Sequence, residues 1–304
     1  MRALIVTKMW PSPEDPAHGA FVRDQVEALR RIDGVEVDVF VFPPGGYARA
    51  AHALRRRHHG GGHDVVHAHF GLTAWVALAL GGPAPRAVTL HGTDVRHPRS
   101  RRITQAALRR MDLIAAVSEE LAAAVPGHHD VRILPCGVDT RRFAPMPRGA
   151  ARRELGLPPD EPCLLFPAHP ARPSKRHDRA MDVADGARLL SLGDVDPAQV
   201  PLWVNAANAV VLPTEREGFG LAVLEALACD VPVLTTPVGN HPEALAGVAG
   251  TLCAPFDLAT WRAAAAGHLA AGDPRVAGRA SAERWSADRM AERVAAAWRE
   301  LLER

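Results

Sequence analysis

Short apolar runs that alternate with helix-like stretches constrain the fold of this chain more than any other feature. In the first half, five such runs end in polar or glycine residues: ALIVT (3–7), VEVDVFVF (35–42), DVVHAHF (64–70), AVTLHG (87–92) and LIAAVS (113–118). Between the first two, GAFVRDQVEALRRI carries apolar residues at positions 21, 22, 26 and 29, the spacing of an amphipathic helix. This alternation predicts βαβ units and a doubly wound parallel sheet, which binds ligands at the carboxyl ends of its strands.

The same alternation returns in the second half of the chain. Its apolar runs lie at 163–169, 187–192, 209–214, 231–236 and 250–255. Residues 140–162, between the halves, are rich in Pro, Gly and Arg, as an interdomain connection would be. We therefore predict an α/β protein with an N-terminal domain over 1–145 and a C-terminal domain over 146–304. A ligand is expected in the cleft between them, and the last helix, at 286–304, is expected to pack back on the N-terminal domain.

Composition narrows the class of protein. Hydrophobic residues make up 47% and charged residues 23%, as in an ordinary globular chain. No run approaches the roughly 18 apolar residues of a membrane span, and the five-residue apolar run at 3–7 is too short for a secretory signal, so we expect a cytoplasmic protein. Four cysteines lie far apart with no CxxC pair, which suggests neither a disulfide framework nor a zinc site.

Charge is distributed unevenly along the chain. Residues 1–150 hold 20 basic and 14 acidic side chains (+6), whereas 151–304 hold 16 and 20 (−4). Much of the excess lies in RHPRSRRITQAALRR (96–110), which has six arginines and no acid. Such a segment is either a solvated face or a contact with anionic lipid, a phosphorylated acceptor or nucleic acid. We expect peripheral contact with an anionic membrane surface, the inner face of the cell membrane, and no nucleic-acid partner.

A glycine turn lies between two glutamates in EREGFGLAVLE (215–225). A strand should end just before it and a helix begin just after it, so that backbone amides at the helix start favour a phosphate. On one helix Glu217 and Glu225 would be roughly 12 Å apart, wider than the about 5 to 9.5 Å of a glycosidase acid pair. The spacing favours two separate contacts to ligand hydroxyls, and the alternative is helix capping by Glu217 with a solvated Glu225.

The longer stretch at 213–243, PTEREGFGLAVLEALACDVPVLTTPVGNHPE, resembles the donor-site signature of the retaining glycosyltransferases of family 4. That signature has a Glu, Gly-Phe-Gly and a second Glu eight residues after the first, followed by an Ala-x-Gly-x-Pro-Val strand and a Gly-Gly-x-x-Glu turn. Further stretches resemble family segments in the same order along nearly the whole chain: PSPEDPAHGAFVRDQVEAL (11–29), DVVHAHF, VTLHGTD (88–94), VSEEL (117–121), ILPCGVDTRRFAP (133–145) and FPAHPARPSKRHDRA (166–180).

The resemblance implies a GT-B architecture, in which two Rossmann-like doubly wound domains face each other across a cleft. It also implies an enzyme that transfers a hexosyl group from a nucleotide diphosphate sugar to an acceptor hydroxyl with retention of the anomeric configuration. Here the second domain is shortened, because ADGARLLSLGDVDPAQVPLWVNAAN (184–208) compresses two strand-helix units.

The family match implies roles for residues of the C-terminal domain. Glu217 would hold the donor sugar's hydroxyls and Glu225 the ribose hydroxyls, and Lys175 would neutralise the diphosphate. Amides of the turn would hold the diphosphate and sugar, from Gly218, Phe219, Gly220 and Leu221. One departure is His169, which stands where the family usually has Arg. Arg172 could supply the missing guanidinium fork.

Two further departures lie in loops, where Asp230 replaces a glycine and GNH stands in place of Gly-Gly before Glu243.

In the N-terminal domain, His91 matches the family histidine that approaches the transferred sugar, so the expected catalytic set is His91, Lys175 and Glu217. Asp94 could orient His91 or cap the helix that follows. Gly19 matches a loop glycine that lets the backbone approach the donor phosphates. His67 and His69 are expected to face opposite sides of their strand, so that HAH is not a metal site.

No essential metal or other cofactor is expected, because no Asp-x-Asp motif is placed to bind the diphosphate. DVD at 194–196 precedes a helix start and is interpreted as its cap. The expected donor is a UDP- or GDP-sugar, and the acceptor a sugar, a lipid-linked or a small molecule. Two alternatives stay open: a GT-B nucleotide-sugar epimerase or hydrolase, and a catalytically silent nucleotide-sugar-binding protein. Neither the donor base nor the acceptor can be identified from the sequence.

Overall fold

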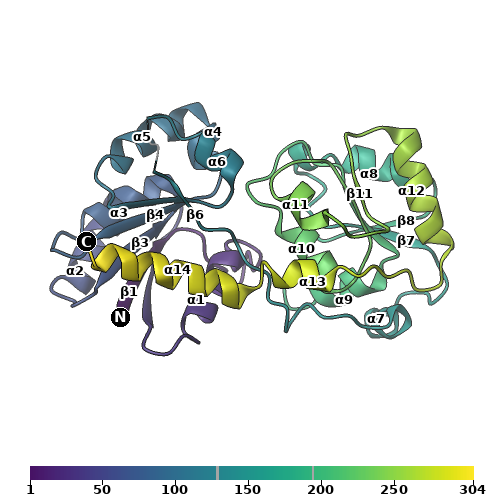
Figure 1. Cartoon of the computed structure of the whole chain (residues 1–304), viewed down its shortest axis with the longest axis horizontal. Coiled ribbons are helices and arrows are strands. Elements are labelled where there is room, and N and C mark those ends of the chain that lie inside the picture. Colours follow the sequence, from purple (N-terminus) through teal and green to yellow (C-terminus); the bar gives the residue numbers. More distant parts are fainter. Residues whose placement is uncertain (128–129, 194) are drawn as a thin grey trace. The chain divides into compact units, whose positions relative to one another are not determined.

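The computed structural model describes residues 1–127, 130–193 and 195–304. They form two compact units (Figure 1). The first, here the N-unit, consists of Met1–Gly137 together with Ala287–Arg304, and the second, the C-unit, of Val138–Ser286. Each unit is an α/β structure built on its own parallel sheet.

The N-unit sheet has the strand order β2-β1-β3-β4-β5-β6, and every neighbouring pair is parallel. Because parallel strands share one direction, the loops after β3 and β4 leave the sheet at the same edge. Five residues of β1 and all of β3 and β4 are buried, as the continuous apolar runs predict. The strands are β1 (Arg2–Thr7), β2 (Glu36–Val41), β3 (Val65–His69), β4 (Arg86–Leu90), β5 (Leu113–Ala116) and β6 (Arg132–Ile133).

Helices cover the N-unit sheet. They are α1 (Ala20–Leu29), α2 (Tyr47–His58), η1 (Gly71–Thr73), α3 (Ala74–Leu78), α4 (Thr93–Arg96), α5 (Pro98–Leu108), α6 (Glu119–Ala123) and α14 (Ala287–Leu302). The last of these comes from the C-terminus and lies along α1 (Figure 1). Its buried stripe includes Met290, Val294 and Trp298, which join one core with Val22 and Val26 of α1. The i, i+4 spacing of that stripe is the reason this helix has one apolar face to bury.

The C-unit sheet has the order β11-β10-β9-β7-β8, again with parallel pairs. Its strands are β7 (Cys163–Phe166), β8 (Arg188–Ser191), β9 (Ala209–Leu212), β10 (Val233–Thr235) and β11 (Leu252–Cys253). Its helices are α7 (Arg148–Leu155), η2 (Pro173–Lys175), α8 (His177–Ala184), α9 (Val200–Ala206), α10 (Leu221–Ala228), α11 (His241–Leu245), α12 (Leu258–Ala270) and α13 (Arg279–Glu283). In the described chain, β8 is the single strand between β7 and β9, so the compressed segment supplies one strand-helix unit there.

A buried arginine ties the start of the C-unit together. Arg152 of α7 is 1% exposed, and its guanidinium donates to the carbonyl oxygens of Ala206, Pro159 and Glu161 at 2.8, 2.9 and 2.6 Å. It also donates to Oδ1 of Asn208 at 3.1 Å. Carbonyl oxygens thus take the place of water around this cation and join α7 to the segment before β7 and to the end of α9.

In the described part of the chain, no helix has the length and apolar composition that a membrane span requires. The four cysteines are free thiols.

We predict that Arg152→Met destabilises the protein by about 3 kcal/mol, because several buried carbonyl oxygens lose a charged donor. Urea unfolding of the full chain measures this loss. The matched control is Arg153→Met, which alters an exposed arginine next to it on the same helix and should leave the midpoint nearly unchanged. Equal midpoints for the two variants would contradict the role given to Arg152.

Candidate functional site

The glycine turn of the C-unit lies where the sequence predicts it, between the end of β9 at Leu212 and the start of α10 at Leu221. Gly220 is the N-cap residue of α10, with a φ of 118°. A Cβ there would lie 2.5 Å from Nε2 of His241 and 2.6 Å from Oδ1 of Asn240. Glycine is therefore required at this helix start both by the backbone conformation and by close packing.

Lys175 and Glu217 are brought together by two loops that leave neighbouring strands. Lys175 ends η2, in the loop after β7, and its Nζ donates a hydrogen bond to Oε1 of Glu217. Their side chains are only 10% and 11% exposed. The loops are joined by the hydroxyl of Thr214 and the amide of Glu215, which both donate to the carbonyl oxygen of Ser174, at 3.0 and 2.9 Å. Each charge thus compensates the burial of the other.

Three of the other predicted donor residues, His169, Arg172 and Glu225, are more open to solvent. His169 is exposed, and its Nδ1 accepts a hydrogen bond from the amide of Ala171 at 3.0 Å. Arg172 is also exposed, three residues before Lys175. Glu225 is half-buried on α10. In the same unit, Phe219 is buried and contacts Trp285 edge-on with ring centroids 5.6 Å apart.

Asn240 and His241 also lie at this helix start, and the sequence analysis did not single them out. Both are at least nine-tenths buried, and neither the side-chain amide of Asn240 nor Nε2 of His241 has a hydrogen-bond partner among the described residues. Nδ1 of His241 lies 3.0 Å from the carbonyl oxygen of Thr236. Burial lowers the pKa of His241, and the charge of Glu217 opposes that shift. The available signal was the GNH departure, because Asn240 takes the place of the second glycine in the family's Gly-Gly-x-x-Glu turn, whereas His241 falls on a position that this pattern leaves open.

The N-unit places its predicted residues at the carboxyl ends of β3 and β4. His91 follows β4, and its Nε2 lies 3.1 Å from Nδ1 of His69. Asp94 holds the loop, because its carboxylate accepts hydrogen bonds from the amides of His91, Gly92 and Gly71 at 2.8 to 3.2 Å. Burial raises the pKa of Asp94, and these amides oppose the shift. Asp94 therefore orients the His91 loop through the backbone.

The interpretation that His67 and His69 face opposite sides of their strand is wrong. Their rings are stacked, with centroids 5.0 Å apart and planes at 17°. Successive side chains of a strand alternate, so residues i and i+2 share one face. Both histidines point to the sheet face that α14 covers, because Nε1 of Trp298 donates to Nδ1 of His67 at 3.0 Å.

Gly19 is the N-cap residue of α1, with a φ of 69°. A Cβ there would lie within 2.5 Å of the backbone of Met9 and Trp10. Packing inside the N-unit therefore already requires glycine at this position. Phe21, two residues further on, contacts the ring of His91 with centroids 5.0 Å apart.

Among the described residues, no group of three His, Cys, Asp or Glu side chains is arranged to hold a metal ion. Asp194 of the DVD segment lies outside the described residues. Asp196 accepts a hydrogen bond from the amide of Ala198 at 2.9 Å, in the turn before α9.

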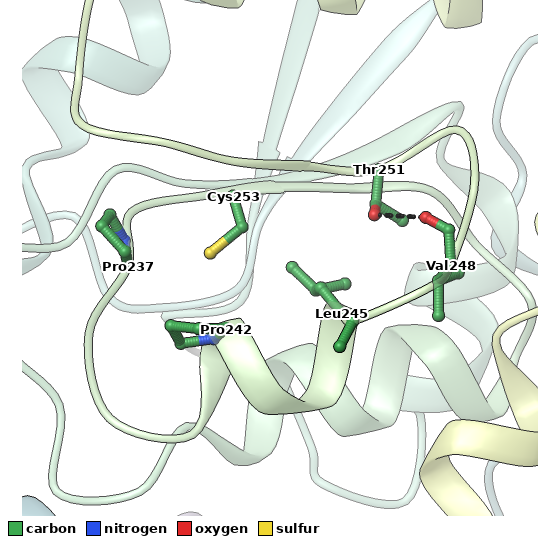
Figure 2. A pocket seen from close by; sticks show the side chains of 7 residues that line it. Pro237, Pro242, Leu245, Val248, Thr251 and Cys253 are labelled. Carbon is green, nitrogen blue, oxygen red and sulfur yellow. Dashed lines mark hydrogen bonds between the residues drawn. The ribbon is translucent and has the colours of Figure 1, made fainter.

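A cavity of about 340 Å³ lies between α11 and β11 in the C-unit, and none of the predicted site residues lines it. Figure 2 shows that the side chains of Pro237, Pro242 and Leu245 make its wall largely apolar, with the sulfur of Cys253 facing in. Thr251 turns its hydroxyl to the carbonyl oxygen of Val248 at 2.7 Å. Because no charged group converges on this cavity, the site around Glu217 is the better candidate for a charged ligand.

Solved structures that are also built of two parallel-sheet units define the class of fold. Sucrose-phosphate synthase from Thermosynechococcus elongatus aligns with a TM-score of 0.80 at 20% identity over 100% of both chains. Anabaena HepE in complex with UDP and glucose aligns with a TM-score of 0.74 at 16% identity over 97% of this chain and 98% of that one. The predicted α/β fold of the GT-B class is thereby confirmed.

The sequence also matches two family descriptions, Glycosyltransferase Family 4 over residues 21–142 and Glycosyl transferases group 1 over residues 168–271. A D-inositol 3-phosphate glycosyltransferase of Mycolicibacterium paratuberculosis is 30% identical over an alignment that covers 90% of this chain and 74% of that protein. The chain therefore belongs to glycosyltransferase family 4, as its motifs predict. Another relative, the D-inositol 3-phosphate glycosyltransferase of Actinosynnema mirum, is 32% identical, and 64% of its length is covered.

Two buried histidines of the N-unit should make its stability depend on pH. Burial lowers the pKa of His67 well below its ordinary value and that of His69 to about 3. Both folded-state values lie below the unfolded value of about 6.5, so the unfolded chain takes up protons first as the pH falls. The contribution of these neutral histidines to stability is present above about pH 6.5 and is lost as the pH falls. Each histidine should lower the free energy of unfolding by about 1.4 kcal/mol when the pH falls from 7.5 to 5.5.

Urea unfolding of the full chain at these two pH values checks this expectation. His69→Asn should remove one histidine's share of the loss, whereas His97→Gln, at an exposed histidine, should leave it unchanged. If the His69 variant keeps the full pH dependence, the assignment to this histidine fails.

Proposed function

We propose that this protein is a retaining glycosyltransferase that moves a hexosyl group from a nucleotide diphosphate sugar to an acceptor hydroxyl. The observation that carries the proposal is the ion pair of Lys175 and Glu217 beside the glycine start of α10. A cation, a carboxylate and a helix N-terminus within one unit suit a ligand that bears both phosphates and hydroxyls. Membership of family 4, whose members generally retain the anomeric configuration, supports the same reaction.

The roles of the C-unit residues follow from their charges. When a donor binds, its diphosphate would compete with Glu217 for Lys175, and the carboxylate released from that pair would accept hydrogen bonds from sugar hydroxyls. Lys175 and the amides at the start of α10 would stabilise negative charge as it develops on the leaving phosphate. Arg172, being exposed, is able to turn its guanidinium toward the same phosphate. Glu225 would accept hydrogen bonds from the ribose.

In this proposal the N-unit contributes His91 to the transferred sugar and the backbone at Gly19 to the donor phosphates. No carboxylate of the chain is assigned as a nucleophile. The acceptor would attack the face that the phosphate leaves, and the leaving phosphate oxygen would take the acceptor's proton. Neither a divalent metal nor another cofactor is required by this scheme.

The donor and acceptor classes are proposed from chemistry and from similar proteins. A UDP- or GDP-sugar is the proposed donor, and Anabaena HepE, whose structure holds UDP and glucose, supports this class. The relatives named for D-inositol 3-phosphate support a phosphorylated small-molecule acceptor beside a sugar or a lipid-linked one. A cytoplasmic location is proposed with these substrates.

We further propose that α5 carries a peripheral contact with anionic lipid at the inner membrane face. Arg99, Arg101 and Arg102 are exposed on it, and Ile103 is 50% exposed among them. Arg110 lies over the ring of Trp75, whose Nε1 donates to the carbonyl oxygen of Ile103 at 3.1 Å. Exposed arginines around an exposed aliphatic side chain suit an anionic headgroup surface.

Measurement of nucleoside diphosphate release from UDP- and GDP-sugars, with and without acceptors, tests the reaction. Glu217→Gln and Lys175→Met should each lower transfer at least about a hundredfold, because each removes a group proposed to act on the donor. Glu215→Gln is the matched control, since Glu215 is an exposed loop residue that pairs with Arg176 at 2.7 Å. Near-normal transfer by either site variant would refute its role.

The two alternatives give different results in the same assay. Donor breakdown or isomerisation that needs no acceptor would indicate a hydrolase or an epimerase. Donor binding without turnover would indicate a silent binding protein. A product with inverted anomeric configuration would refute retention.

The lipid contact is tested by sedimentation with vesicles. Binding to phosphatidylglycerol vesicles should exceed binding to phosphatidylcholine vesicles, and changing Arg99, Arg101 and Arg102 together to Gln should weaken it roughly a hundredfold. Changing exposed Arg56 and Arg57 of α2 to Gln serves as the control. Equal binding to both kinds of vesicle would remove this proposal.

A further inference from the structure

Three histidine rings form a stack at the carboxyl ends of β3 and β4. The rings of His67 and His69 have centroids 5.0 Å apart, and those of His69 and His91 are 5.3 Å apart with planes at 22°. His67 and His69 are fully buried, whereas His91 is partly exposed. Burial lowers the pKa of all three, so each ring is neutral near pH 7 and carries a single proton. The position of that proton decides which nitrogen donates.

The proton of His67 is located by Trp298. An indole N–H only donates, so Nδ1 of His67, 3.0 Å from Nε1 of Trp298, must be the acceptor. The neutral ring then carries its proton on Nε2. This N–H donates to the hydroxyl oxygen of Thr89 at 2.8 Å.

The proton of His69 is located by burial. Nδ1 of His69 lies 3.1 Å from Nε2 of His91, and a hydrogen bond there needs one proton between the two nitrogens. Nε2 of His69 is buried and has no partner among the described residues. Orphaned buried N–H groups are rarer than under-satisfied acceptors. The lower-energy arrangement therefore leaves Nε2 of His69 without a proton, and Nδ1–H of His69 donates to Nε2 of His91.

We infer that His69 is a positioning residue that holds His91 as the neutral tautomer with its proton on Nδ1. With Nε2 occupied as an acceptor, Nδ1–H of His91 is the group left to donate to a ligand oxygen. A neutral N–H donor suits a sugar hydroxyl and adds no positive charge to the site. The tautomer follows from the N-unit alone, whereas its value for sugar transfer rests on the proposed function.

The tautomer is tested directly in the full-length protein by ¹⁵N NMR of its histidine side chains at pH 7.5, without any ligand. His91 should show the chemical shifts of an Nδ1–H ring. His69→Asn keeps an amide N–H close to the place of Nδ1 and should preserve that pattern. His69→Leu removes the donor, so His91 should shift toward the Nε2–H form.

Transfer kinetics test the positioning role. The Leu variant should lose at least about tenfold in kcat, with little change in the KM of the donor, while the Asn variant stays near normal. His63→Asn is the control, because its buried ring contacts Asp38 at 2.9 Å in the same unit, away from the stack. Retention of the Trp298 indole proton signal verifies that the Leu variant still packs α14 on the sheet.

The outcomes separate the two proposals. The inference is overturned if His91 of the wild-type protein carries its proton on Nε2. It is also overturned if a folded Leu variant shows unchanged His91 signals or an unchanged kcat. If the tautomer is found but no nucleotide sugar is turned over, the positioning of His91 stands and the proposed transferase function fails.

Discussion

The hydrogen bond from Trp298 to His67 is the contact on which the N-unit arrangement depends most. It joins the C-terminal helix to the central strand β3 across 231 residues of sequence, inside the core. A buried indole N–H needs an acceptor, and a buried imidazole with its proton on one nitrogen has one to offer. The same bond places the proton of His67 on Nε2. It also holds α14 over the sheet face to which His69 points, and the ring of His91 stacks on that of His69. The packing of α14 on the sheet therefore also sets the hydrogen bonding of the histidine stack.

In each unit, parallel strands bring the polar residues to one edge of the sheet. In the N-unit the loops after β3 and β4 hold Gly71 and His91, and Asp94 ties these two loops together through backbone amides. In the C-unit the loops after β7 and β9 hold Lys175 and Glu217, and the Ser174 carbonyl ties those loops together. These hydrogen bonds between buried groups give each edge a defined geometry before a ligand is present.

Local pattern was sufficient for the fold class and the family, because both are expressed in short windows of sequence. Continuous apolar runs mark strands buried on both faces, and the glycine turn at 218–220 marks a helix start. The error over His67 and His69 was one of strand geometry. The partners of the site residues were harder to foresee: Glu217 and Lys175 are separated by 42 residues, and only the pairing of β7 with β9 makes them neighbours.

The sequence by itself determined the alternation of strands and helices, the family and the identity of the candidate donor residues, since these depend on residue types at short spacing. Tertiary structure decided that Lys175 and Glu217 form one buried ion pair, and that Asn240 and His241 crowd the start of α10. It also decided which imidazole nitrogens carry protons. The physical reason is burial: leaving a polar atom without both water and a partner costs free energy, and residues far away in the chain supply most of the partners.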